Sequence, residues 1–379
     1  MQLTLRKRLF NSYINLNFYR SLYYHINIIM LSKPATIKDI AQILKVSVST
    51  VSRGLQDHPS IGAVTRQKIK KLAKELNYEP NQTAIFLQKG STQTIGVILP
   101  ELSEAFFSTA VSAIEEIAYK GNYTVLLAQS HDDEQLEKQL VEKMKNHRVD
   151  GLLVSVAKNT SSYQHFEKLK QYNIPVVFFD RIPAIQNIHY VACNMETGTV
   201  EAVSFLLKKG HRSIGLINGP NTIVASGERK EGYIKAMTKN RLKYDPSLIV
   251  SCDLTENGTQ TALDTLLANK RKPTAIVTFN DYVALFAIKH ARSLKLQINK
   301  DIEFVSYANL PMINYMEHVP AASVEQFPYL QGQKAADILL DLLNQKKQGF
   351  NEQTAYYKII IESQLVERLK TPINKPGKK

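Results

Sequence analysis

The chain has 379 residues and a formal net charge of +14 at pH 7. One hydrophobic core rarely serves more than about 250–300 residues, so this length predicts two or three compact units. Two cysteines are too few for a disulfide framework or a cysteine-rich metal cluster, and they suit a reducing cytoplasm. No apolar run approaches the ~20 residues of a membrane span, which argues against a membrane-spanning protein.

Residues 1–32 differ in composition from the rest of the chain, being basic and rich in aromatic side chains. Their apolar stretches are broken by Asn, Tyr, Arg and His, and no small-residue cleavage site follows, so an export signal is disfavoured. Met30 stands immediately before the first clear helix pattern. We therefore expect these residues to be either an upstream extension assigned in error or a disordered arm, and we place no function there.

Residues 36–55 predict two short helices joined by a tight turn. Thr36 followed by Asp39 has the spacing of a capping box, in which each side chain satisfies a backbone N–H of the other residue. Ser47 is in position to cap a second helix over residues 48–55. This arrangement is typical of a helix-turn-helix, whose second helix enters the major groove of DNA.

The outer side of the second helix carries small, hydroxyl and guanidinium side chains. Small residues let a helix approach the groove, hydroxyls contact base edges or phosphates, and Arg can pair with guanine through two hydrogen bonds. The residues that we expect to contact DNA here are Thr36, Ser47, Val48, Ser49, Thr50, Ser52 and Arg53. A capped pair of amphipathic helices also occurs in proteins that do not bind DNA, so this pattern alone leaves both interpretations open.

A third amphipathic helix over residues 64–76 would close a small three-helix core with the other two. The segment 31–92 also concentrates basic residues, while the rest of the chain after Thr92 carries little excess charge. A basic small unit attached to a nearly neutral large one favours a polyanionic partner, although a merely solvated basic surface is the alternative.

The run VSVSTVSRGLQDHPSIGAVTRQKIKKLAKELNYEPN resembles the headpiece of the lactose-repressor (LacI/GalR) family of bacterial transcription regulators. Its most specific parts are Thr50-Val51-Ser52-Arg53 and Asn77-Tyr78-Glu79-Pro80-Asn81, and the resemblance continues to about Arg368. It implies a helix-turn-helix domain over residues 33–80, a hinge helix or linker over 81–92, an effector-binding and dimerisation domain over 93–368, and a flexible tail over 369–379.

The hinge helix is expected only by this resemblance. Pro80 should end the third helix, and a segment as short as 82–89 is not stable alone. In the family such a helix orders on the operator and places a leucine in the minor groove, which implies that role for Leu87. The sequence Ala84-Ile85-Phe86-Leu87-Gln88 lacks the arginines common in relatives, so a plain linker remains the alternative.

From Thr94 onward, short β-branched runs alternate with amphipathic helices, which predicts parallel sheets with crossover helices. Eight such runs exceed one comfortable sheet, so we expect two doubly wound α/β subdomains with a ligand cleft between them. The resemblance implies the type I periplasmic-binding-protein-like fold. The expected strands lie within residues 94–100, 123–129, 151–156, 175–180, 213–219, 247–253, 275–280 and 303–308.

Ligands in such folds bind beyond the carboxyl ends of the strands. Guanidinium, amide and carboxylate groups there would bind hydroxyls, and aromatic faces would pack on a sugar ring. The residues that we expect at the effector site, partly by resemblance, are Phe106, Phe107, Asp180, Arg181, Arg229, Asn280, Asp281 and Asn309.

Each of these has a structural alternative. The phenylalanines could be ordinary core, Arg181 could serve a structural ion pair, and Asp281 could only cap a helix. Many relatives carry an aspartate where this chain reads Ser306-Tyr307-Ala308-Asn309, so a carboxylate ligand is missing there and Asn309 is its expected substitute.

The resemblance implies a cytoplasmic, nucleoid-associated homodimer that binds a palindromic operator in double-stranded DNA and acts as a repressor of carbohydrate-related genes. Helices near residues 106–119 and 280–294 would pair the subunits, and a sugar or sugar phosphate is the expected effector, with a nucleoside or a phosphorylated protein as alternatives. We expect no cofactor, no metal and no catalysis, because the chain has no Walker loop, HExxH or GxSxG motif. A solute-binding component of a sugar transporter is the competing function, but it would have no use for a helix-turn-helix.

Overall fold

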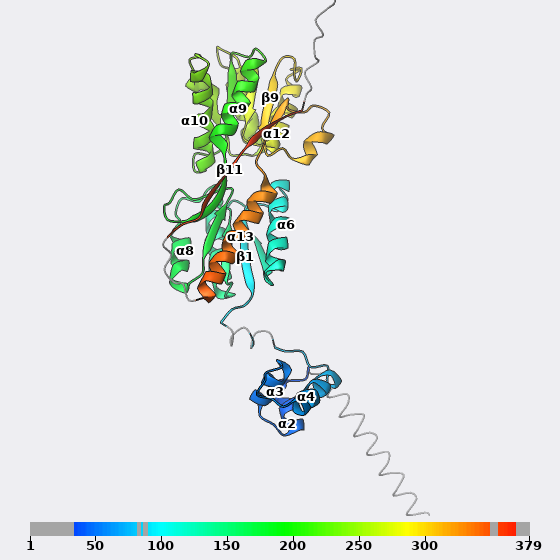
Figure 1. The fold of residues 1–379 in the computed structure, drawn as a ribbon. Coiled ribbons are helices and arrows are strands. Elements are labelled where there is room, and N and C mark those ends of the chain that lie inside the picture. Colours follow the sequence, from blue (N-terminus) through cyan, green and yellow to red (C-terminus); the bar gives the residue numbers. More distant parts are fainter. Residues whose placement is uncertain (1–33, 82–84, 86–89, 349–354, 369–379) are drawn as a thin grey trace, which may run out of the picture. The chain divides into compact units, whose positions relative to one another are not determined.

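The computed structural model describes residues 34–81, 85, 90–348 and 355–368. The chain divides into two compact units, residues 1–90 and 91–379. Among the described residues, the first unit is helical and the second contains two sheets flanked by helices, as Figure 1 shows. No helix within the described ranges is both long and apolar enough to cross a membrane.

The first unit contains helices α2 (Ile37–Leu44), α3 (Val48–Leu55) and α4 (Ala63–Glu75). The two predicted caps form: Asp39 Oδ2 accepts the Thr36 N–H at 2.8 Å, and Ser47 Oγ accepts the Thr50 N–H at 3.1 Å. Lys45 takes a left-handed backbone conformation, with φ of 53°, and so makes the turn between α2 and α3. The shared core of the three helices consists of Ile40, Ala41, Val51, Ile69 and Ala73.

The second unit contains two six-stranded sheets. The first has the order β11-β5-β4-β3-β1-β2, with β11 (Lys358–Glu362), β5 (His189–Asn194), β4 (Val176–Phe179), β3 (Gly151–Val154), β1 (Thr94–Leu99) and β2 (Thr124–Gln129). The second has the order β12-β10-β9-β8-β6-β7, with β12 (Gln364–Glu367), β10 (Ala322–Glu325), β9 (Glu303–Tyr307), β8 (Ala275–Thr278), β6 (Ile214–Asn218) and β7 (Ile249–Ser251). All strand pairs are parallel except β10 with β12.

Helices cover both faces of each sheet, with separate apolar clusters on the two sides. Helices α6 (Ala105–Lys120) and α13 (Pro328–Lys347) pack together on the first sheet, as Figure 1 shows. The remaining elements of the two subdomains are α7 (Glu134–Asn146), α8 (Gln164–Glu167), η1 (Lys168–Tyr172), α9 (Met195–Lys208), α10 (Val224–Lys239), η2 (Pro246–Leu248), α11 (Glu256–Leu267), α12 (Asp281–Ser293) and η3 (Pro311–Tyr315).

The chain passes from one subdomain to the other after β5, after β10 and after β11. The predicted architecture of two doubly wound subdomains is therefore confirmed. The eight strands expected from the sequence all form, and β5, β10, β11 and β12 were not foreseen.

Candidate functional site

One face of α3 is exposed to solvent and free to contact the bases of a nucleic acid. Val48 has an exposed fraction of 42%, Ser49 and Arg53 are also exposed, and Val51 on the opposite side is fully buried. The capping hydroxyl of Ser47 also lies 2.8 Å from the hydroxyls of Ser49 and Thr50. The first turn of α3 is therefore a compact group of small polar side chains.

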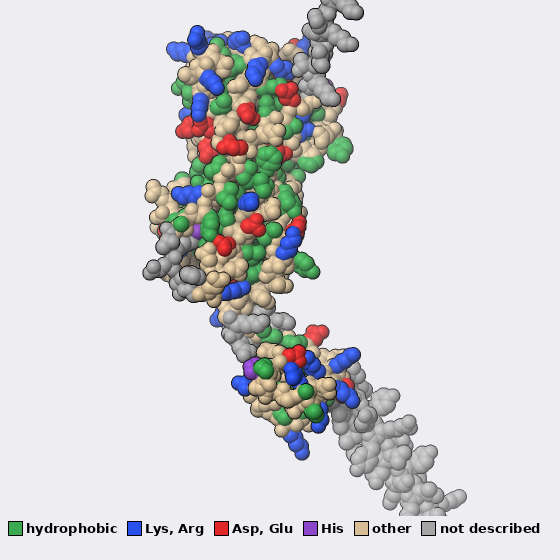
Figure 2. Space-filling view, in the orientation of Figure 1, with side chains coloured by type: hydrophobic (Ala, Val, Ile, Leu, Met, Phe, Trp, Pro, Cys, Tyr) green, Lys and Arg blue, Asp and Glu red, His purple; other side chains and the backbone are tan. Residues whose placement is uncertain are grey.

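The loop between α3 and α4 is held by a carboxylate. Lys70 Nζ donates to both carboxylate oxygens of Asp57 at 2.6 Å, and Arg66 Nη1 donates to the Asp57 carbonyl at 3.2 Å. The hydrogen bond from Lys70 is the main cause that lowers the pKa of Asp57. In the part of the chain that the structure describes, Arg53 forms no ion pair, so its guanidinium remains available on the exposed face of α3. Figure 2 shows Lys and Arg side chains over the surface of this unit.

Thr36 lies at the start of α2, exposed, with its hydroxyl donating to Asp39 Oδ2 at 2.7 Å. Ser52 and Thr50 are half-buried on the flank of α3. The structure thus gathers the predicted DNA-contacting residues on the first two helices. Leu87 and most of the expected hinge helix lie outside the described residues.

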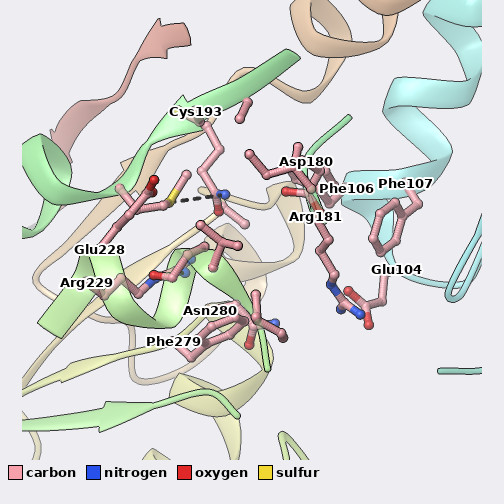
Figure 3. Close-up of a pocket in the computed structure, with 18 of the residues that line it drawn as sticks. Glu104, Phe106, Phe107, Asp180, Arg181, Cys193, Glu228, Arg229, Phe279 and Asn280 are labelled. Carbon is pink, nitrogen blue, oxygen red and sulfur yellow. Dashed lines mark hydrogen bonds between the residues drawn. The ribbon is translucent and has the colours of Figure 1, made fainter. Parts of the chain in front are cut away.

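A cavity of about 50 Å³ lies between the two subdomains of the second unit. It is bordered by segments that follow strands β1, β4, β6, β8, β9 and β10, as expected for a doubly wound fold. A water molecule needs roughly 10–15 Å³ of such volume, so the enclosed part of the cavity has room for a few waters. Figure 3 shows how its side chains converge.

Arg229, on α10, is the most enclosed polar group of the cavity, with an exposed fraction of 2%. Its guanidinium carbon lies 4.1 Å from the ring centre of Phe279 and 4.5 Å from that of Tyr307. Nη1 donates to the Ala225 carbonyl at 3.2 Å, whereas Nε has no hydrogen-bond partner among the described residues. Burial lowers the pKa of Arg229, and the aromatic rings offset part of that desolvation through cation–π attraction.

Asp180 and Arg181 follow β4 on the other side of the cavity. Asp180 has a left-handed backbone, with φ of 58°, and burial raises the pKa of its carboxyl to about 6, opposed by Arg181 and Arg229. Arg181 Nη1 lies 2.6 Å from Asp132 Oδ1, and its guanidinium carbon lies 5.6 Å from the ring centre of Phe107. Arg181 therefore both lines the cavity and forms the ion pair that was its structural alternative.

Six of the predicted effector-site residues line this cavity together: Phe106, Phe107, Asp180, Arg181, Arg229 and Asn280. The phenylalanines also belong to the core, with their ring centres 5.3 Å apart and edge to face. Asn280 caps α12 by accepting the Val283 N–H at 2.9 Å.

Asp281 and Asn309 do not line the cavity. The Asp281 carboxylate is fully buried and accepts hydrogen bonds from the Leu310 N–H at 2.6 Å, the Ser323 hydroxyl at 3.1 Å and the Ser306 hydroxyl. Asn309 donates to Glu325 Oε2 at 2.8 Å and accepts from Arg368. The structure therefore places both side chains in hydrogen-bond networks beneath the cleft.

Several lining residues were not foreseen. Those with polar, sulfur or aromatic side chains are Glu104, Cys193, Met195, Glu228, Phe279, Tyr282 and Gln326. Glu228, Phe279 and Tyr282 directly flank expected positions, and Glu104 lies two residues before Phe106. Cys193, Met195 and Gln326 follow or belong to strands β5 and β10, which the sequence did not predict.

A second set of contacts joins the subdomains. Lys158 Nζ, from the loop after β3, donates to the Asp253 carbonyl at 3.0 Å, and the Thr222 hydroxyl donates to the Lys158 carbonyl. Lys158 Nζ also lies 3.6 Å from Asp132 Oδ2. Within the described ranges, no group of three or more His, Cys, Asp or Glu side chains is arranged to hold a metal ion.

Comparison with known proteins matches both units. Residues 36–81 match the family described as bacterial regulatory proteins, lacI family, and residues 92–365 match periplasmic binding proteins and sugar binding domain of LacI family. Catabolite control protein A of Priestia megaterium is 31% identical over 312 residues, which are 82% of this chain and 93% of that protein. The HTH-type transcriptional repressor PurR of Vibrio atlanticus is 28% identical over 313 residues, 82% of this chain and 93% of that protein.

Among solved structures, the Lac repressor dimer bound to operator and the anti-inducer ONPF is similar to this chain with a TM-score of 0.73 and 26% identity. The similarity covers 89% of this chain and 98% of that chain. It therefore extends over both the headpiece and the two-subdomain unit.

Proposed function

Because the chain belongs to the lacI family of bacterial regulatory proteins, we propose that it is a sequence-specific DNA-binding transcription repressor controlled by a small molecule in the cleft of its second unit. The observation that carries the proposal is the capped helix-turn-helix whose α3 presents Val48, Ser49 and Arg53 to solvent. A solute-binding transport component would gain nothing from such a unit, so the regulator is favoured over that function.

The proposal includes a homodimer on a palindromic site in double-stranded DNA. One helix-turn-helix reads too few base pairs for selectivity, and two-fold symmetry in a protein matches a palindrome. The Lac repressor to which the chain is similar is a dimer bound to operator. Tyr119 on α6 is 83% exposed and Leu294, next to α12, is 45% exposed, which supports these two predicted helices as pairing surfaces.

The effector is proposed to be a sugar-like compound held by the six predicted residues that line the cavity, since the matching family includes a sugar binding domain. We assign no catalytic step, because the relatives are regulators. A repressor acts on chromosomal DNA, so we place it in the cytoplasm on the nucleoid, and the role of Leu87 as a minor-groove wedge remains part of the proposal.

The experiment is selection of binding sites from random duplex DNA with the purified full chain, followed by titrations at fixed salt. We expect enrichment of a palindrome. Arg53→Ala should then lose about 1–3 kcal/mol of discrimination at one base position of each half-site. The control is Lys239→Ala, which removes an exposed basic side chain at the end of α10 and should bind DNA as the wild type does.

A pool that shows no enriched sequence would refute the proposed function. Undiminished base discrimination by Arg53→Ala would remove only that residue from the DNA-contacting face. On the effector side, Arg229→Ala should abolish the response of DNA binding to the ligand while leaving DNA binding itself intact.

A further inference from the structure

The cleft is richer in carboxyl groups than in cations. Three carboxyls line it, Glu104, Asp180 and Glu228, against the two guanidinium groups of Arg181 and Arg229. Figure 3 shows the Glu104 carboxylate beside the Arg181 guanidinium, and Glu228 next to Arg229 on α10. The balance of charge therefore depends on how far each Arg is already neutralised.

The positive charge of Arg181 is already paired with a carboxylate. Asp132 Oδ1 lies 2.6 Å from its Nη1, and the Glu104 carboxylate interacts with the same guanidinium through charge attraction alone. Asp132 also forms an ion pair with Lys158, whose Nζ lies 3.6 Å from Asp132 Oδ2. An anion that enters beside Arg181 would meet the Asp132 carboxylate, which this guanidinium already binds, and would be repelled by the nearby Glu104 carboxylate.

Arg229 is the remaining guanidinium of the lining, and the nearest charges to it are Asp180 and Glu228. Burial is the first cause that raises the pKa values of Glu104, Asp180 and Glu228, which means that the cavity disfavours the negative charge it already holds. The Nε of Arg229 has no partner among the described residues and belongs to a side chain with only 2% exposure, so it is a donor that needs an acceptor. A neutral hydroxyl oxygen satisfies it without adding charge.

Helix N-termini at the cleft favour a negatively charged ligand, because their free N–H groups and helix dipoles attract anions. Four helices, α6, α9, α10 and α12, begin at the cleft, and each already carries a capping or acidic side chain at its cap or in its first two turns. Glu104 immediately precedes α6, while Asn280 caps α12 and Asp281 stands in its first turn. Asn194 caps α9 and Glu196 stands in its first turn, and α10 carries Glu228 in its second turn.

We infer that the cleft accepts a polyhydroxy ligand that carries no negative charge, either neutral or amine-bearing, and rejects the phosphorylated form of the same compound. Carboxylates would accept hydrogen bonds from its hydroxyl or ammonium groups, Arg229 would donate to its oxygens, and Phe106, Phe107 and Phe279 would pack on its C–H faces. This inference rests on the proposed function in one respect only, that the cleft is where the effector binds.

The test uses the full chain in thermal-shift and calorimetric titrations against matched sets: glucose, glucosamine and glucose 6-phosphate; galactose, galactosamine and galactose 1-phosphate; ribose and ribose 5-phosphate. Repulsion between like charges in such a site costs enough that each phosphate should bind at least about 100-fold more weakly than its parent. A phosphorylated member that binds more tightly than its parent, and whose binding is lost in Arg229→Ala, would overturn the inference.

A second measurement decides the matter if no member of these sets binds. Glu104→Gln combined with Glu228→Gln removes two of the three carboxylates, and affinity for inorganic phosphate should then rise by about tenfold or more. Glu231→Gln is the matched control, because it makes the same change on the exposed side of α10. Equal phosphate affinity in the double variant and the control would overturn the inference.

Binding of selected DNA is measured in parallel, so the two failures can be told apart. A chain that binds neutral sugars but selects no DNA sequence refutes the proposed function and leaves the charge preference standing. A chain that binds a palindrome and responds to a sugar phosphate refutes the charge preference alone.

Discussion

Gly232 sets how closely α10 approaches α9, and its replacement by alanine tests the packing that positions Arg229. A Cβ atom at this position would lie 2.4 Å from the Glu196 carbonyl oxygen and 2.8 Å from Thr199 Cβ. Ordinary van der Waals contact begins at 3.4 Å, so the two helices would have to separate by roughly 1 Å. Because the obstacle includes backbone, a side-chain rotation cannot relieve it.

The magnitude follows from two opposing effects. Overpacking of this kind costs about 1–3 kcal/mol, and replacing glycine by alanine inside a helix returns about 1 kcal/mol. We expect Gly232→Ala to lower the free energy of unfolding by about 0–2 kcal/mol, towards the larger value because the clash is with backbone. Gly227→Ala, in the same helix, is the control: outside its chain neighbours and its own helix backbone no atom lies within 4 Å of its added Cβ, so it should stabilise by about 0.5–1 kcal/mol.

The assay is urea denaturation of the full chain followed by circular dichroism. With a slope of about 1–3 kcal/mol per molar urea, the midpoints of the two variants should differ by roughly 1 M, with Gly232→Ala the lower. Since α10 also carries Arg229, Gly232→Ala should weaken effector binding while Gly227→Ala does not. Equal midpoints for the two variants would refute the argument that this glycine is required by the approach of the helices.

Three further outcomes are expected. Thr36→Ala removes the capping box with Asp39 and should cost about 1 kcal/mol in the first unit, seen as faster hydrogen exchange in α2; unchanged exchange would contradict it. Burial raises the pKa of Asp281 from 3.8 to about 6, so the native state holds this proton more tightly and wild-type stability falls as pH rises from about 4 to about 6. The stability of Asp281→Asn relative to wild type should therefore rise by about 3 kcal/mol from about pH 4 to about pH 7. A difference in the free energy of unfolding that stays constant across that range would refute the assignment. Lys158→Ala breaks the contact with the Asp253 carbonyl and should speed hydrogen exchange at both residues without moving the unfolding midpoint by more than about 1 kcal/mol; unaltered exchange would show that this contact does not hold the cleft.

The first unit could be predicted almost to the residue because its signals are local. A capping box needs only Thr36 and Asp39, and α3 begins one residue after Ser47, as its cap requires. The third helix begins at Ala63 and ends at Glu75, one residue earlier at each end than expected, because Gly62 provides no side-chain cap to mark its start. Helix periodicity and caps are short-range, so tertiary context changed little here.

The strands that escaped prediction depend on distant partners. β11 alternates exposed and half-buried residues at the edge of the first sheet, and β12 pairs antiparallel with β10 from a chain segment about 40 residues away. β10 has four residues, too few for a periodic pattern. β11 and β12 become strands because a sheet edge is available to them, and β10 because it pairs with β9 and β12 on its two sides; no local window reveals such partners.

The side-chain directions in the cleft were beyond sequence reasoning for a related reason. Ala308 and Asn309 both have positive φ, 85° and 49°, and this turn directs Asn309 to Glu325 and Arg368. The left-handed region is unusual for alanine, so nothing in the composition predicts it. Strand ends located the cavity, but the turn geometry decided which of the residues there face it.

The three crossings between the subdomains connect the cleft to both of them. They are tied to one another: the Asn194 side chain donates to both Glu362 carboxylate oxygens at 3.1 Å, and the Ser363 hydroxyl donates to the Asn194 carbonyl at 2.8 Å. Two cavity residues, Met195 and Gln326, stand directly on two of these crossings, and Gln326 Nε2 lies 3.7 Å from Met195 Sδ.

A ligand in the cavity therefore touches the segments about which the subdomains would move. The cavity lies between the two subdomains, so its shape changes when they move, and a ligand held in it shifts the equilibrium between their placements. The ligand can shift the equilibrium between two placements of the subdomains only by its difference in affinity for them. Because the crossings are linked by hydrogen bonds, a shift moves both subdomains together. Substitutions at Met195 or Gln326 should consequently alter the size of the effector response more than they alter DNA binding without effector.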